Sequence, residues 1–135
     1  MRLITLLLRP AAALLGVACL MVSPCHGQQQ GDDASAQLVF NNACRTCHTT
    51  KEGDNRLGPQ LGGIIGRKAG SLPGYGYSSA MKGADFVWDE DRLGRFIENP
   101  DEVVPGNNMK PFSGVVSADE RAKIIAFLKS AGAGQ

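Results

Sequence analysis

Cys44, Cys47 and His48 form a motif whose residue types and spacing point directly to chemistry. In Cys-x-x-Cys-His, two thiols three residues apart near the end of a helix can form thioethers to the two vinyl groups of one porphyrin. The histidine that follows is then carried under the iron, where its ring can serve as the proximal ligand. The motif therefore predicts covalent attachment of one c-type haem.

Two other uses of these cysteines fit the sequence less well. A thioredoxin-type redox disulfide needs a strand that leads into the motif and a βαβ setting, whereas a helical pattern leads into Cys44 here. A zinc site needs a fourth ligand, and no further Cys or His follows His48 in the sequence. A c-type haem is therefore favoured over a disulfide or a zinc ion.

Residues 1–27 have the composition of an export signal. Arg2 supplies a positive start, apolar stretches follow, and the chain becomes polar after residue 22. The apolar run 11–22 is shorter than the roughly 20 residues that span a bilayer. We therefore expect cleavage near Gly27 and a periplasmic protein, with a membrane anchor through an uncleaved leader as the alternative.

Removal of this leader changes the charge balance of the chain. The leader holds Arg2 and Arg9 and no acidic residue, so the mature chain has one more acidic than basic side chain. This balance gives no electrostatic case for nucleic-acid binding. Residues 28–33 read as a solvated linker, and residues 34–135 are expected to form the functional domain.

The positions of apolar residues predict an all-α domain. Helical spacing extends over 34–47, 89–99 and 117–129, and a shorter helical turn is expected at 78–82. No alternating strand pattern of useful length is present.

Local signals define the ends of two of these helices. Trp88 and Leu93 have the spacing of a hydrophobic staple, and Asn99-Pro100 predicts a stop for the helix that the staple opens. Ser117 and Glu120 have the spacing of a capping box, which predicts the start of the last helix.

Between the helices, residues 53–76 contain eight glycines and two prolines and show no regular pattern. A loop of this length is uncommon in a compact domain. Disorder is excluded because 43% of the chain is hydrophobic and only 20% is charged. The loop is therefore expected to fold around a large apolar cofactor that completes the core.

Taken in order, the motifs resemble those of the class I c-type cytochromes, the family of mitochondrial cytochrome c and bacterial cytochrome c2. The resemblance extends from about residue 36 to residue 131. The matching motifs are Cys44-x-x-Cys47-His48, Gly58-Pro59-x-Leu61, Gly66-Arg67-Lys68, Tyr75-x-Tyr77, Trp88, Glu98-Asn99-Pro100, Pro105-Gly106-Asn107-Asn108-Met109 and Ile125-Ala126-Phe127-Leu128.

The resemblance implies the cytochrome c fold, with the N- and C-terminal helices crossing and long loops wrapped around one covalent haem. It also implies roles for residues beyond the attachment motif. Met109 falls where the family has the second axial iron ligand, opposite His48. Asn107 stands where a hydroxyl residue usually supports that methionine. The remaining implied cofactor contacts are Pro59 to the His48 ring, Tyr77 and Trp88 to a propionate, and Arg67 to the charge of that propionate.

The function implied by the resemblance is one-electron transfer by a soluble, monomeric carrier and not enzymatic turnover. The implied partners are redox proteins such as a cytochrome bc1 complex, a terminal oxidase or a photosynthetic reaction centre. A haem enzyme or ligand sensor is the alternative, and it requires an open distal position on the iron. An exported thiol–disulfide oxidoreductase is a third hypothesis, and it would lack haem.

Overall fold

The computed structural model describes residues 27–133, and the predicted leader lies outside this range apart from Gly27. The regular structure of these residues is helical, apart from an isolated antiparallel bridge between Lys68 and Val87. The helices are α1 (Gly27–Ala43), α2 (Ser79–Gly83), α3 (Glu90–Glu98), α4 (Pro100–Val103) and α5 (Ala118–Ala133). The all-α class predicted from the sequence is confirmed.

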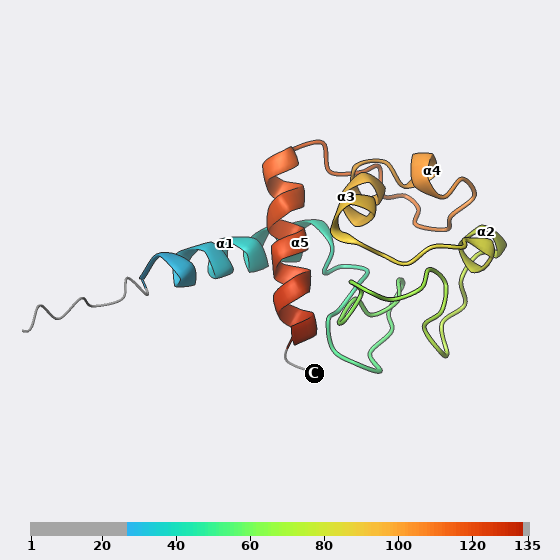
Figure 1. The fold of residues 1–135 in the computed structure, drawn as a ribbon, viewed down its shortest axis with the longest axis horizontal. Helices are drawn as coiled ribbons and strands as arrows, with labels where there is room; N and C mark the ends of the chain where they lie inside the picture. The colour runs from blue at the N-terminus through green and yellow to red at the C-terminus, as the bar shows by residue number, and fades with distance from the viewer. Residues whose placement is uncertain (1–26, 134–135) are drawn as a thin grey trace, which may run out of the picture.

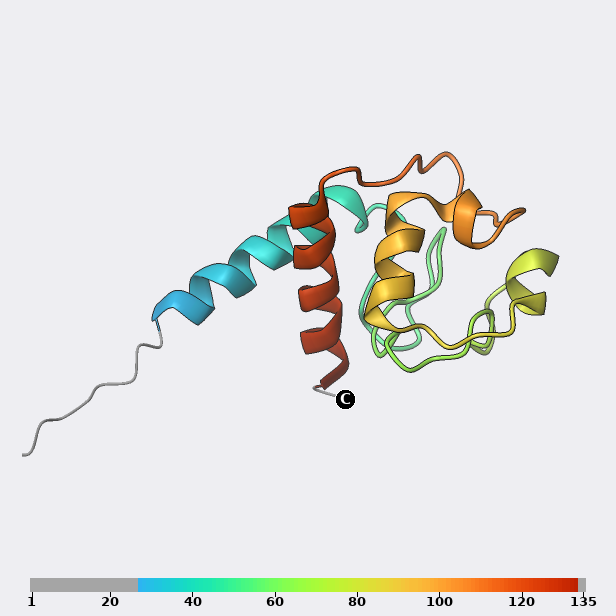
Figure 2. The same ribbon diagram turned by 45° about the horizontal axis from the view of Figure 1, so that its top comes forward.

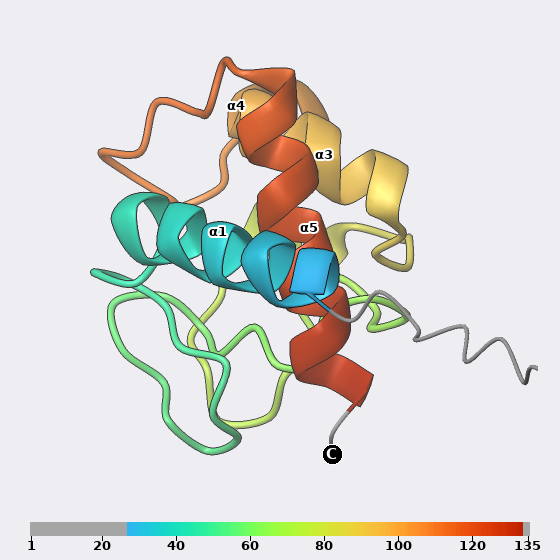
Figure 3. The same ribbon diagram turned by 90° about the vertical axis from the view of Figure 1, so that its left-hand side faces the viewer.

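Helices α1 and α5 cross and pack against each other, as expected (Figures 1 and 3). Phe40 of α1 contacts Phe127 of α5, with 4.7 Å between the ring centroids. Ile124 and Leu128 of α5 are 0% and 1% exposed, and burial of each side chain contributes about 1.5–3 kcal/mol. This crossing fixes the end of α1, where the Cys-x-x-Cys-His segment begins.

The first helix differs from its predicted bounds at both ends. It starts at Gly27, so residues 28–33, predicted as a linker, are helical. Residues 31–34 are exposed, and the first turns of α1 project away from the rest of the molecule (Figure 2). The helix ends at Ala43 and is followed by a turn over 44–47, because Cys44 N–H and Arg45 N–H both donate to the Phe40 carbonyl.

The middle of the domain contains one helix more than the sequence predicted. α3 starts at its cap Asp89, whose side chain accepts a hydrogen bond of 2.7 Å from Arg92 N–H. It ends before Asn99, as predicted, but Pro100 then starts the short helix α4. Proline suits the first position of a helix because its missing N–H has no intrahelical partner there.

Serine side chains cap the starts of α2 and α5, and of these two caps only the second was predicted from the sequence. Ser78 caps α2, and its hydroxyl accepts from Met81 N–H at 3.1 Å. Ser117 accepts from Glu120 N–H at 3.3 Å, but α5 extends beyond the predicted end at residue 129 to Ala133.

Between α1 and α2 the chain forms long loops, which in Figure 1 lie below α3 and to the right of the lower half of α5. These loops approach the helices closely. Gly70 has φ +63°, and a Cβ at this position would lie 2.5 Å from the Met81 carbonyl oxygen. The loop that the sequence predicted over 53–76 is thus packed against the helices.

No helix within residues 27–133 combines the length and the apolar character that a membrane crossing requires.

Candidate haem-binding site

The His48 ring is held in one orientation by the loop that follows it. Its Nδ1 lies 2.7 Å from the Pro59 carbonyl oxygen, and the side chain is buried, with 6% exposed. Burial lowers the pKa of His48, although the hydrogen bond to Pro59 opposes that shift. The ring is therefore neutral with its proton on Nδ1, and the Nε2 lone pair is available to a metal.

The backbone on both sides of His48 fixes the position of this loop. Gly58 N–H donates to the Cys47 carbonyl at 2.8 Å, and Leu61 N–H donates to the Thr49 carbonyl at 2.7 Å. A Cβ at Gly58 would lie 2.2 Å from His48 Cε1, so only glycine allows this approach. The sequence showed Gly58 as part of a motif but did not show this contact.

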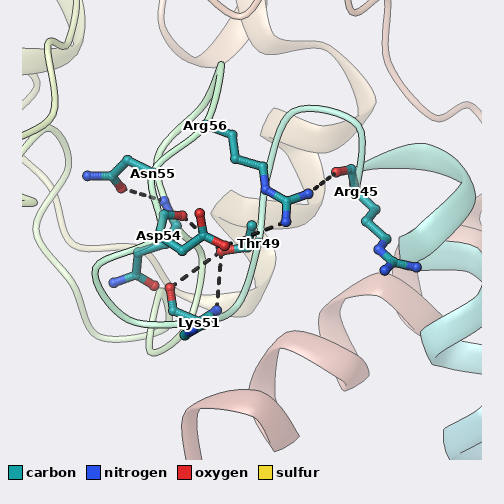
Figure 4. A network of polar contacts seen from close by, with 7 residues as sticks. Arg45, Thr49, Lys51, Asp54, Asn55 and Arg56 are labelled. Atoms are coloured by element: carbon teal, nitrogen blue, oxygen red, sulfur yellow. Dashed lines mark hydrogen bonds and ion pairs between the residues drawn. The ribbon is translucent and has the colours of Figure 1, made fainter.

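A second set of contacts closes the turn after His48 (Figure 4). The Thr49 hydroxyl donates to the Asp54 carbonyl at 2.9 Å and accepts from Lys51 N–H at 3.3 Å. Arg56 pairs with the Asp54 carboxylate at 3.5 Å and donates to the Arg45 carbonyl at 3.4 Å. These contacts connect the turn to Arg45, one of the two residues between the cysteines.

Cys44 and Cys47 are free thiols at the end of α1. His48 N–H donates to the Cys44 carbonyl at 2.9 Å, so all three residues of the motif belong to one turn. Burial, and to a smaller extent the neighbouring Cys47, raises the pKa of Cys44 to about 11. A dithiol that exchanges disulfides requires a thiolate at neutral pH, which this environment disfavours.

A metal site built from side chains is also disfavoured. Within residues 27–133, no group of three or more His, Cys, Asp and Glu side chains is placed to hold a metal ion. Among the described residues, the Cys44 and Cys47 thiols thus belong to no cluster of side chains that could build a zinc site.

Arg67 reaches back to the loop that holds His48. Its guanidinium donates to the Gln60 carbonyl at 2.9 Å and to the Gly62 carbonyl. Burial lowers the pKa of Arg67, while the neighbouring Tyr77 opposes that shift. Burial also raises the pKa of Tyr77, which is hydrogen-bonded to Arg67 and to the Leu72 backbone. Arg67 thus fastens the 58–62 loop in addition to supplying positive charge.

Trp88 lies in the core and is 5% exposed. Its ring meets Phe86 and Phe96 edge to face, with centroids 4.8 and 5.0 Å away. Its backbone N–H donates to the Arg67 carbonyl at 2.9 Å. The contact of its indole N–H with a propionate stays a prediction.

Met109 follows α4 in the loop that leads toward α5. It is half-buried and packs against the hydrophobic core that also contains Cys44 and Trp88. Its backbone N–H donates to the Asn107 side-chain oxygen at 2.9 Å. The other candidate thioether, Met81, lies in α2 and is 8% exposed.

These residues fit a covalently attached haem. Two thiols lie in one turn, a neutral imidazole beside them has a free Nε2, and a thioether from a distant loop packs on the same core. The chemistry of this donor set matches His/Met ligation of haem iron. Pro59 accepts the hydrogen bond of the His48 ring, and Arg67 fixes the loop that contains Pro59. Asn107 accepts the hydrogen bond of the Met109 backbone N–H.

Comparison with known families gives the same result. Residues 31–128 match the family model described as cytochrome C oxidase, cbb3-type, subunit III. The chain is 40% identical to cytochrome c of Euglena viridis over 100 residues. This aligned region covers 74% of this chain and 97% of the relative. It is also 40% identical to cytochrome c2 of Rhodopila globiformis over 100 residues, and this aligned region covers 74% of this chain and 93% of the relative.

Solved structures show the same fold. Cytochrome cH from Methylobacterium extorquens superimposes with a TM-score of 0.66 and 36% sequence identity, covering 74% of this chain and 99% of that structure. Residues 27–133 therefore have the fold of a c-type cytochrome. With these relatives, the chain belongs to the class I c-type cytochromes, the family of cytochromes c and c2. Its cofactor is one covalently attached haem c.

Proposed function

We propose that this protein is a one-electron carrier whose iron is ligated by His48 and Met109. The observation that carries the proposal is the 2.7 Å hydrogen bond between His48 Nδ1 and the Pro59 carbonyl oxygen, because it fixes the tautomer that leaves Nε2 free. In the same proposal Cys44 and Cys47 form the two thioethers, which keep the cofactor bound in both oxidation states.

The residues of the site each favour rapid electron exchange without other chemistry. The haem supplies an iron that changes between the ferric and ferrous states. The Met109 thioether is a soft ligand, which favours the ferrous state and raises the potential. Trp88 and Tyr77 are proposed to bind a propionate, and the partly buried Arg67 is proposed to offset its charge. With His48 and Met109 both bound to it, the iron would have no open site for oxygen or peroxide.

Carbon monoxide distinguishes the carrier from a haem enzyme or ligand sensor. We expect the reduced, haem-loaded protein to show no change in its visible spectrum under carbon monoxide at neutral pH, because Met109 occupies the distal position. Stoichiometric formation of a carbon monoxide adduct within seconds would favour the enzyme or sensor instead. The ferrous protein in a carbon monoxide-free buffer is the control.

We propose that the protein is exported and acts in the periplasm. The proposal is supported by the composition of residues 1–27 and by the similarity to bacterial carriers such as cytochrome c2. N-terminal sequencing of the haem protein from the periplasmic fraction should give a start near Gln28. Recovery of intact Met1 in the membrane fraction would instead show an uncleaved anchor.

We propose redox proteins as its partners, with a cytochrome bc1 complex, a terminal oxidase and a photosynthetic reaction centre as the candidate classes. Transient redox encounters require only a small interface, which a domain of this size can offer. Reduction of the ferric protein by a purified complex, and oxidation of the ferrous protein by another, is the measurement that assigns donor and acceptor.

A further inference from the structure

The carboxylate of Asp101 contacts the loop that carries Met109. Asp101 lies in α4, and its Oδ1 accepts a hydrogen bond of 2.9 Å from Asn107 Nδ2. Its Oδ2 forms an ion pair with Lys110 Nζ. Asn107 precedes Met109 by two residues and Lys110 follows it directly, so the two oxygens of Asp101 contact the chain on both sides of Met109.

Asn107 transmits this contact to the backbone of Met109. Its side chain is buried, with 5% exposed, and its Nδ2 also donates to the Val104 carbonyl at 3.0 Å. Its Oδ1 accepts from Met109 N–H at 2.9 Å. Both amide hydrogens and the amide oxygen are therefore engaged, and the side chain has one orientation in which all three bonds form.

The position of the Asp101 carboxylate is fixed by the packing of α4. α4 begins at Pro100, which is buried, and ends before Val104, which is 4% exposed and donates its N–H to the Pro100 carbonyl at 2.9 Å. α4 packs against α3, which contributes three residues to the core. A path of direct contacts thus runs from α3 through α4 and Asp101 to Asn107.

We propose that Asp101 is a positioning residue for Met109, acting through Asn107 to hold the ligand loop closed over the iron. The inference rests on the proposed function, in which Met109 is an axial ligand. It assigns a role to Asp101, which no sequence motif singled out. It also explains how Asn107 supports the methionine, through the hydrogen bond from Met109 N–H to its side-chain oxygen.

The two contacts of Asp101 differ in strength. Lys110 and Asp101 have side chains 56% and 53% exposed, and ion pairs this exposed contribute little. The bond from buried Asn107 to an ionised carboxylate is charge-assisted, and its loss leaves a buried amide N–H without a partner. The Asn107 bond is therefore expected to carry most of the effect.

The experiment measures how readily an added ligand displaces Met109. Imidazole is titrated into the ferric, haem-loaded protein, and loss of the near-infrared sulfur-to-iron charge-transfer band gives its apparent affinity. In the parent protein the Met109 loop is expected to open rarely, so the apparent affinity for imidazole should be low. For Asp101→Ala we expect the affinity to rise about tenfold, which is equivalent to about 1.4 kcal/mol of loop opening.

Glu102→Ala is the matched control, because it removes the same charge from the next residue of α4. Glu102 is exposed, and in the described part of the chain its side chain has no hydrogen bond or ion pair. We expect its imidazole affinity to stay within about twofold of the parent protein, and that of Lys110→Gln within about threefold. Asp101→Asn should lie between the parent and Asp101→Ala, since an amide oxygen can still accept from Asn107.

Equal affinities for Asp101→Ala and Glu102→Ala would overturn the inference. If Asp101→Ala does not accumulate, the comparison of Asp101→Asn with Glu102→Gln decides the question in the same way. A denaturant midpoint that falls while imidazole affinity stays constant would show that Asp101 only stabilises the fold, which also overturns it. Absence of the near-infrared band in the parent protein would contradict Met109 ligation itself, and so the proposed function.

Discussion

A Cys44→Ser, Cys47→Ser double variant is expected to retain no covalently attached haem. Serine keeps the size and hydrogen-bonding capacity of the side chain but cannot form the thioether to a vinyl group. Denaturing electrophoresis followed by haem staining, after extraction with acid acetone, should show a strong band for the parent chain and none for the variant.

The effect should extend to the fold, because the long loops between α1 and α2 have little regular structure of their own. Without attached haem, we expect loss of a cooperative unfolding transition. Thr46→Ser is the control, since Thr46 is exposed between the two cysteines and takes no part in attachment. A stained band that survives acid acetone in the double variant would contradict attachment through this motif.

Met109→Ala is expected to abolish the near-infrared sulfur-to-iron band and to lower the reduction potential on the order of 0.1–0.2 V, since axial ligation sets haem potentials over a wide range. Loss of the soft thioether removes its preference for the ferrous state. The open position should then bind carbon monoxide, which the parent protein should not. Optical spectra and a redox titration of the purified variant measure all three effects.

Met81→Leu is the matched control for this variant. Met81 is the other methionine in the described part of the chain, but it is buried in α2 and its backbone is covered by Gly70. Leucine keeps its volume and apolar character, so the band and potential should remain. If the band persists in Met109→Ala and disappears in Met81→Leu, the ligand assignment is reversed.

The helices whose ends carry strong local signals were predicted well from the sequence. Asp89 caps α3 and Ser117 caps α5, and both caps depend on contacts within four residues. α4 was not predicted because Pro100 was interpreted only as a stop, whereas proline also suits the first position of a new helix. The helical start of α1 at Gly27 was missed because residues 28–33 are polar and lack an apolar face.

The site could be predicted as a set of residues, but of its contacts the resemblance implied few, among them the bond between the His48 ring and the Pro59 carbonyl. The attachment motif specifies Cys44, Cys47 and His48, because their chemistry depends on spacing alone. The bonds of Arg67 to the Gln60 and Gly62 carbonyls could not be foreseen, since they depend on how a loop without a repeating pattern folds. The contacts of Asp101 could not be predicted for the same reason, because they form with the Met109 loop only when α4 is in place.

Spectroelectrochemical titration of the full-length, haem-loaded protein tests the central claim most directly. A one-electron carrier with fixed His48 and Met109 ligands should titrate reversibly as a single centre, with a slope of about 59 mV per decade. Its spectra should share isosbestic points throughout, and the ferric end should show the sulfur-to-iron band. Hysteresis between the oxidative and reductive directions, more than one component, or a ferric spectrum without that band would contradict the account.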